Sequence, residues 1–301
     1  MMRACCLAGF AGLLLVSPAL AQSEGEPRDA GNDRSIVVTA ELPTWTEVTR
    51  QARAITAPTG IRYLPLPRFE GDRLCPGVIG LKADYAALVI DRIRANAERF
   101  DLWMTDDDGT CLPNFIVAFV DDGHGTLQQI ADRWSWLFTG MPRHERLALL
   151  AEDGPAWVWT TTETRTRDGM PVAEDPVSGT MMVGMWSAHS KIYIPVREDI
   201  TAVLVLFDRE AVRGKTLVQL ADYATMRGLA RTRPADGEAL DTILTLFEPD
   251  ATPPAELTAF DRAYLGALYS GLPNMPGLSK VLGVSSRLRR QARAEQAAAS
   301  E

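Results

Sequence analysis

The sequence predicts an α+β fold in which a mixed sheet packs against helices and the C-terminal half is helical. Two apolar runs, residues 114–120 (NFIVAFV) and 201–207 (TAVLVLF), are typical of strands inside a sheet. Residues 82–100 carry apolar side chains at helical spacing, with most charged side chains on the other side. From residue 215 onward, three further helical segments follow one another.

Local signals place the remaining elements in chain order. A helix over 45–55 is opened by Thr44 or Thr46, and residue Gly228 is expected just after a helix as its C-terminal cap. Thr258-x-x-Asp261 resembles a capping box, which opens the last of the three helices. Helices are therefore expected at 45–55, 82–100, 127–138, 144–150, 215–227, 237–246 and 258–269, and strands at 114–120, 157–167, 181–195 and 201–207.

The N-terminus has the pattern of a secretory signal. Arg3 precedes a short apolar run, and Pro18-Ala19-Leu20-Ala21 predicts cleavage after Ala21, so we expect an exported, periplasmic protein. The predicted organisation is a signal peptide over 1–21, a flexible linker over 22–34, one domain over 35–275, and a basic tail over 276–301 that is a frayed helix or disordered. Residues 35–40 (SIVVTA) resemble a TonB box, although a first strand of the domain or an N-terminal arm is the favoured interpretation.

The cysteines bear on the compartment of the protein, and its net charge bears on the classes of partner that it can bind. Removal of the signal leaves Cys75 and Cys111, and an oxidising compartment predicts a disulfide between them, stabilising by roughly 3–4 kcal/mol; two buried thiols are the alternative. The formal net charge of −8 becomes −9 when Arg3 leaves. This acidity opposes binding to nucleic acid or to an anionic membrane surface. No later segment predicts stable membrane insertion, and the sequence does not indicate an oligomeric state.

Four landmarks in residues 201–269 occur in a fixed order. A strand leads to a helix carrying Ala221-Asp222-Tyr223-Ala224-Thr225, and Gly228-Leu229 follow it. Residues 241–247 (DTILTLF) then follow, with Leu244 at their centre, and residues 257–269 read L-T-x-x-D-x-x-x-L-x-x-L-Y, with Asp261 and Tyr269. This order resembles the catalytic half of zincin metalloproteases, especially the metzincin-like group. The resemblance implies a zincin-like fold, with residues 221–225 at the H-E-x-x-H positions and Leu244 at the Met-turn.

The chemistry of these positions differs from that of a zinc protease. Catalytic zinc requires three lone-pair donors, two of them on one helix face at i and i+4. Here Ala221 and Thr225 occupy those positions, Arg231 occupies the third-ligand position, and Asp222 stands at the general-base position. Alanine donates nothing, and arginine repels a cation. The resemblance therefore implies a protein without catalytic residues, metal or cofactor, a pseudoprotease that keeps a cleft for a peptide or envelope protein.

Other interpretations remain open at this stage. The helix over 215–227 is also consistent with ordinary buried packing, in which Asp222, Thr225 and Arg227 have no special role. Residues 209–216 imitate a phosphate-binding loop but have Arg209 in place of its first glycine. The alternative function is a periplasmic hydrolase with a rebuilt site near His124 or His189.

Overall fold

The structure is a computed structural model, and it describes residues 43–57, 60–106, 108–138, 141–174, 181–182, 194–235 and 241–299. The signal, the linker and residues 35–40 lie outside these ranges. The elements in chain order are α1 (Trp45–Ile55), β1 (Pro76–Ile79), α2 (Ala83–Arg99), β2 (Phe115–Val120), α3 (Gly123–Arg133), η1 (Ser135–Phe138), α4 (Arg143–Ala151), β3 (Ala156–Thr166), β4 (Ala173–Glu174), β5 (Met181–Met182), β6 (Val196–Asp208), α5 (Leu217–Leu229), η2 (Ile243–Thr245), α6 (Ala259–Tyr269) and α7 (Gly277–Ala299).

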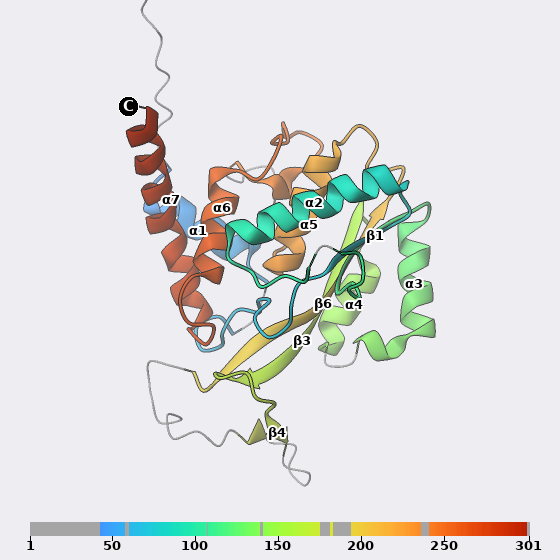
Figure 1. The fold of residues 1–301 in the computed structure, drawn as a ribbon, viewed down its shortest axis with the longest axis horizontal. Coiled ribbons are helices and arrows are strands. Elements are labelled where there is room, and N and C mark those ends of the chain that lie inside the picture. The colour runs from blue at the N-terminus through green and yellow to red at the C-terminus, as the bar shows by residue number, and fades with distance from the viewer. Residues whose placement is uncertain are drawn as a thin grey trace, which may run out of the picture. The chain divides into compact units, whose positions relative to one another are not determined.

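A four-stranded mixed sheet runs through the fold in the order β1-β2-β6-β3. Figure 1 labels three of its strands, β1, β6 and β3. β1, β2 and β6 are parallel to one another, whereas β3 runs antiparallel to β6 and forms one edge of the sheet. Helices α5, α6 and α7 supply most of the described chain after β6. The predicted α+β class with a mixed sheet and a helical C-terminal half is therefore confirmed.

Each face of the sheet is covered by its own apolar cluster. The larger cluster joins one face to α1, α2, α5, α6 and α7, and the smaller joins the other face to α3, η1 and α4. Figure 1 shows the same division, with α3 and α4 on one side of the strands. Side chains alternate along β3, so that Trp157 and Trp159 belong to the smaller cluster while Ala156 and Val158 pack on the larger one.

Two predictions about local chemistry are confirmed. Thr44 opens α1 and Thr258 opens α6, each through a capping box in which side chain and backbone bond reciprocally. Cys75 and Cys111 form a disulfide, with their Cα atoms 6.3 Å apart. Such a bond fits an oxidising compartment. None of the described helices is both long and apolar enough to cross a bilayer.

Two predicted boundaries are wrong. Gly228 does not follow α5 but lies inside it, since the helix continues to Leu229. A helix over 237–246 is not found in the part of that range that is described, where Ile243–Thr245 form a short 3-10 turn instead. The tail, expected to be a frayed helix or disordered, contains the 23-residue helix α7, and Val281, Val284 and Leu288 of this helix are buried in the larger cluster.

Close packing explains why residue 228 is a glycine. A Cβ atom there would lie 2.5 Å from the ring of Phe115 and 2.8 Å from Val203 Cγ1. Replacing Gly228 with alanine should therefore lower the free energy of unfolding by about 1–3 kcal/mol, because the helix must move off the sheet. Gly283→Ala in α7 is the control, since its Cβ would meet nothing closer than 4.0 Å. Urea unfolding should show stabilisation of the control by up to about 1 kcal/mol; equal effects of the two changes would contradict this explanation.

Candidate functional site

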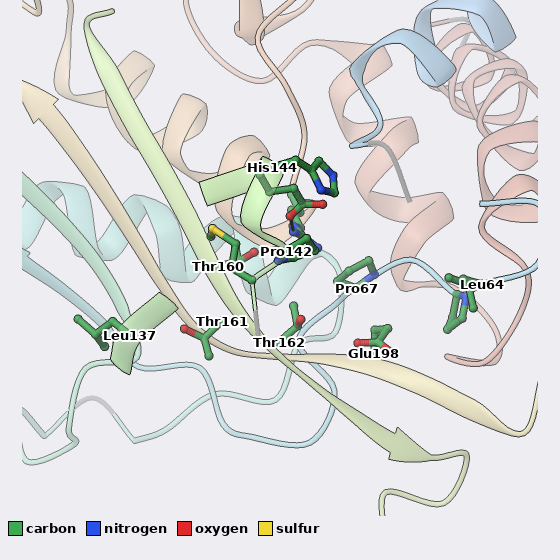
Figure 2. A pocket seen from close by; sticks show the side chains of 13 residues that line it. Leu64, Pro67, Leu137, Pro142, His144, Thr160, Thr161, Thr162 and Glu198 are labelled. Atoms are coloured by element: carbon green, nitrogen blue, oxygen red, sulfur yellow. Dashed lines mark hydrogen bonds and ion pairs between the residues drawn. The ribbon is translucent and has the colours of Figure 1, made fainter. Parts of the chain in front are cut away.

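Two adjoining cavities lie along the edge strand β3. Their volumes are about 310 and 570 Å³, and Met141, His144, Glu145, Thr160 and Arg231 line both. We call the combined feature the edge groove: it is bordered by residues 158–162 of β3, by α4, and by residues 231–234 after α5. Figure 2 shows Thr160, Thr161 and Thr162 following one another along β3, beside a space also bordered by His144 and Pro67.

The hydrogen bonds of β6 fix the direction of its backbone groups. Val203 N–H donates to the carbonyl of Asn114 over 2.8 Å, on the side of β2. Asp208 N–H donates to the carbonyl of Pro155 over 3.0 Å, on the side of β3. Because backbone groups alternate between the two sides of a strand, the even-numbered residues of β6 near Asp208 bond to β3.

This alternation leaves part of β3 without a backbone partner. Trp157 and Trp159 lie opposite Leu206 and Leu204, so their N–H and C=O groups bond to β6. The N–H and C=O groups of Val158 and Thr160 therefore point away from β6, beyond the edge of the sheet, where no strand of the described ranges pairs with them. The Thr160 hydroxyl is also buried without a hydrogen-bond partner. The groove thus presents unpaired edge-strand backbone beside a cavity.

An ion pair connects the two walls of the groove. The guanidinium of Arg231 lies 2.6 Å from the carboxylate of Glu145 on α4, and both side chains are about one fifth exposed. Arg231 has φ of 47°, in the left-handed region, immediately after the end of α5 and Ala230. Burial raises the pKa of Glu198 in the smaller cavity, and Arg231 partly offsets this rise.

A second arginine in the groove is almost fully buried. Arg227 is 5% exposed and donates from Nη1 to the hydroxyl of Tyr223 over 2.5 Å, while its Nε lacks a partner among the described residues. Glu152 lines the same cavity, but the two side chains form no ion pair. Burial raises the pKa of Glu152, and the charge of Arg227 opposes this rise.

Three of the predicted motif positions lie away from this groove. Asp222 is fully buried between α5 and α2 and accepts two hydrogen bonds of 2.7 Å from Arg92. It also accepts from the amide of Asn96 over 2.6 Å and from the backbone N–H of Leu257 over 2.8 Å. Asp222 therefore holds α2 and the start of α6 against α5. It has a structural role that the interpretation as ordinary helix packing does not assign to it.

Thr225 and Ala221 are turned toward the same interface. The Thr225 hydroxyl donates to the Ala221 carbonyl over 2.8 Å and accepts from Asn96 over 3.2 Å. Of the four motif positions, only Arg231 reaches the groove. Ala221 supplies no donor, the Thr225 hydroxyl and the Asp222 carboxylate are already bonded, and Arg231 is a cation, so these residues do not fit a catalytic zinc ion.

The remaining landmarks of the resemblance hold helices together. Leu244 is buried in η2, which contacts α5. Asp261 accepts from the Thr242 hydroxyl over 2.5 Å and from Ile243 N–H over 2.8 Å, which attaches η2 to α6; burial raises its pKa to about 6. The hydroxyl of Tyr269 donates to the Leu229 carbonyl over 2.7 Å, fixing the end of α5.

The two histidines of the described residues, His124 and His144, lie on different helices, α3 and α4. His124 lies in the first turn of α3, 3.2 Å from the amide of Gln128 and 6.2 Å from the ring of Trp157. His189 lies outside the described residues. Within the described ranges, no group of three or more His, Cys, Asp or Glu side chains is placed to hold a metal ion.

Sequence reasoning missed the residues that form the groove. His144 and Glu145 lie in a predicted helix and Thr160 in a predicted strand, but nothing in their spacing indicates that they meet. The one available signal was Arg227, a cation between Met226 and the small and apolar residues Gly228 and Leu229. Comparison with protein-family models, with curated proteins and with solved structures finds no match to this chain.

Proposed function

We propose that this chain is a non-catalytic exported protein with a zincin-like fold, a pseudoprotease whose edge groove binds an extended segment of a peptide or envelope protein. The observation that carries the proposal is the outward-facing backbone of Val158 and Thr160 beside a cavity. An added strand satisfies such groups, and each hydrogen bond contributes roughly 0.5–1.5 kcal/mol.

The chemistry of α5 supports binding without catalysis. Ala221 and Thr225 supply no metal ligands, and all four donors to Asp222 are in place, so its carboxylate is not free to activate water. The succession of α2, β2, β6, α5, η2 and α6 follows the order that the zincin resemblance implies. The groove lies along the antiparallel edge strand, where the resemblance places the substrate cleft.

Amide hydrogen exchange tests which backbone groups are available. In the free protein, the amides of Val158 and Thr160 should exchange at least about 100-fold faster than those of Trp157 and Trp159, because only the latter pair bonds to β6. Adding a pool of acetylated, amidated octapeptides should slow the first pair alone. Unchanged exchange of Val158 and Thr160 at saturating peptide would contradict strand addition.

Substitution of Thr160 provides an independent test. Thr160→Pro removes one outward N–H without removing a bond to β6, and it should weaken peptide binding at least ~10-fold. Thr160→Ala keeps the N–H and is the matched control, so its affinity should remain close to that of the original protein. Circular dichroism of both variants verifies that the fold is retained.

A further inference from the structure

Arg227 places a buried positive charge in the edge groove without an ion-pair partner among the described residues. Only 5% of Arg227 is exposed, and its only hydrogen bond among the described residues goes to the neutral hydroxyl of Tyr223. A buried guanidinium keeps its charge, and an unpaired buried charge is strongly unfavourable. Arg231, by contrast, is neutralised by Glu145. The Nε of Arg227 is buried without a partner among the described residues, and the residue lines the 570 Å³ cavity, where an anion would neutralise the guanidinium.

The sheet geometry determines which part of a bound peptide reaches this cation. Val158 packs on the larger apolar cluster, the face of the sheet on which α5 lies, whereas Trp159 packs on the opposite face. In paired strands, residues directly opposite each other point their side chains to the same face. A peptide residue opposite Val158 or Thr160 thus directs its side chain toward α5 and Arg227.

We propose that the edge groove selects peptides with an acidic side chain, and that Arg227 binds the carboxylate of an Asp or Glu opposite Val158 or Thr160. This inference rests on the proposed function, because it requires a peptide on the edge of β3. Guanidinium and carboxylate match in shape and charge, so the contact gives both affinity and selectivity. The Tyr223 hydroxyl, 2.5 Å from Nη1, positions the guanidinium.

Substitution of Glu152 tests the same contact through an expected gain of affinity instead of a loss. Glu152 lines the cavity, and its charge interacts with that of Arg227. Glu152 therefore competes with a ligand carboxylate for Arg227 and repels it. Glu152→Gln should strengthen binding of acidic peptides, whereas a purely structural role of Arg227 predicts no gain.

The experiment compares two pools of acetylated, amidated octapeptides, one with a central position fixed as Glu and one with that position fixed as Gln. Fluorescence anisotropy should show at least ~10-fold tighter binding of the Glu pool. Arg227→Met should abolish this preference, so that the two pools bind with equal affinity, and Arg227→Lys should retain part of it. If Arg227→Met does not fold, Arg227→Lys and Glu152→Gln decide the question, the latter with a gain of about 3-fold for the Glu pool.

The outcomes separate this inference from the proposed function. Equal affinities for the two pools would overturn the inference and leave strand addition intact. A preference for a third pool, with Gln at the centre and a free C-terminal carboxylate, would assign Arg227 to the chain end and overturn the side-chain contact. Absence of binding by every pool, with unchanged exchange at Val158 and Thr160, would overturn the proposed function itself.

Discussion

Replacing Asp222 with alanine is expected to lower the free energy of unfolding by about 3–5 kcal/mol, as for other buried charged pairs that lose one partner. The carboxylate is fully buried and accepts four hydrogen bonds, from Arg92, Asn96 and Leu257. Arg92 is 21% exposed and regains some hydration when its partner is removed, so we expect the lower part of this range. Asn96 and the Leu257 N–H lose an acceptor in a buried position, which adds to the cost.

Urea unfolding of Asp222→Ala measures this effect, and Glu256→Gln is its matched control. Glu256 binds the same guanidinium of Arg92 at 2.9 Å but is 58% exposed, so its loss should cost less than about 1 kcal/mol. Peptide affinity of the folded Asp222 variant should stay unchanged, because the carboxylate faces α2 and not the edge groove. A stability equal to that of the control would show that Asp222 does not hold α2 in place.

The sequence predicted most elements of the fold because their signals are local. Capping residues Thr44 and Thr258 and the apolar run of β6 act within a few positions of the chain, and each was confirmed. β1 (Pro76–Ile79) was missed, since a four-residue edge strand begins with proline and has little apolar pattern. The sequence left the tail open between a frayed helix and disorder, because the few apolar residues of α7 gain their burial from α6, which periodicity alone does not reveal.

The candidate site was less predictable because its residues come together only when distant segments of the chain pair or pack. The Thr-rich strand over 157–167 was predicted, but its antiparallel place at the sheet edge depends on β6, which begins 30 positions after β3 ends. Arg227 and Glu152 lie in one cavity through the packing of α5 beside β3. The alignment of residues 221–225 with a zinc motif did not predict which way the Asp222 side chain points. In the structure, this side chain points toward α2.

Removing the disulfide by the double substitution Cys75→Ala, Cys111→Ala is expected to lower the free energy of unfolding by about 3–4 kcal/mol. The bond joins residues separated by 36 positions, and the loop between them contains β1 and α2. In the chain-entropy description, it acts mainly by restricting the unfolded chain. Folded-state contacts around Cys75 persist without it, since the Asn114 side chain accepts from Cys75 N–H over 2.8 Å.

Combining this change with Asp222→Ala distinguishes two explanations of the disulfide's effect. If the disulfide acts on the unfolded chain, the two losses should add within about 0.5 kcal/mol, because Asp222 acts on the folded state. If the disulfide instead holds α2 in position for Arg92 and Asn96, the combined loss will be smaller than the sum. We expect additivity, because Cys75 is already attached to the start of β2 by hydrogen bonds from Asn114 and Phe115 to its carbonyl. Urea unfolding of the two parents and of the combined variant decides between these explanations.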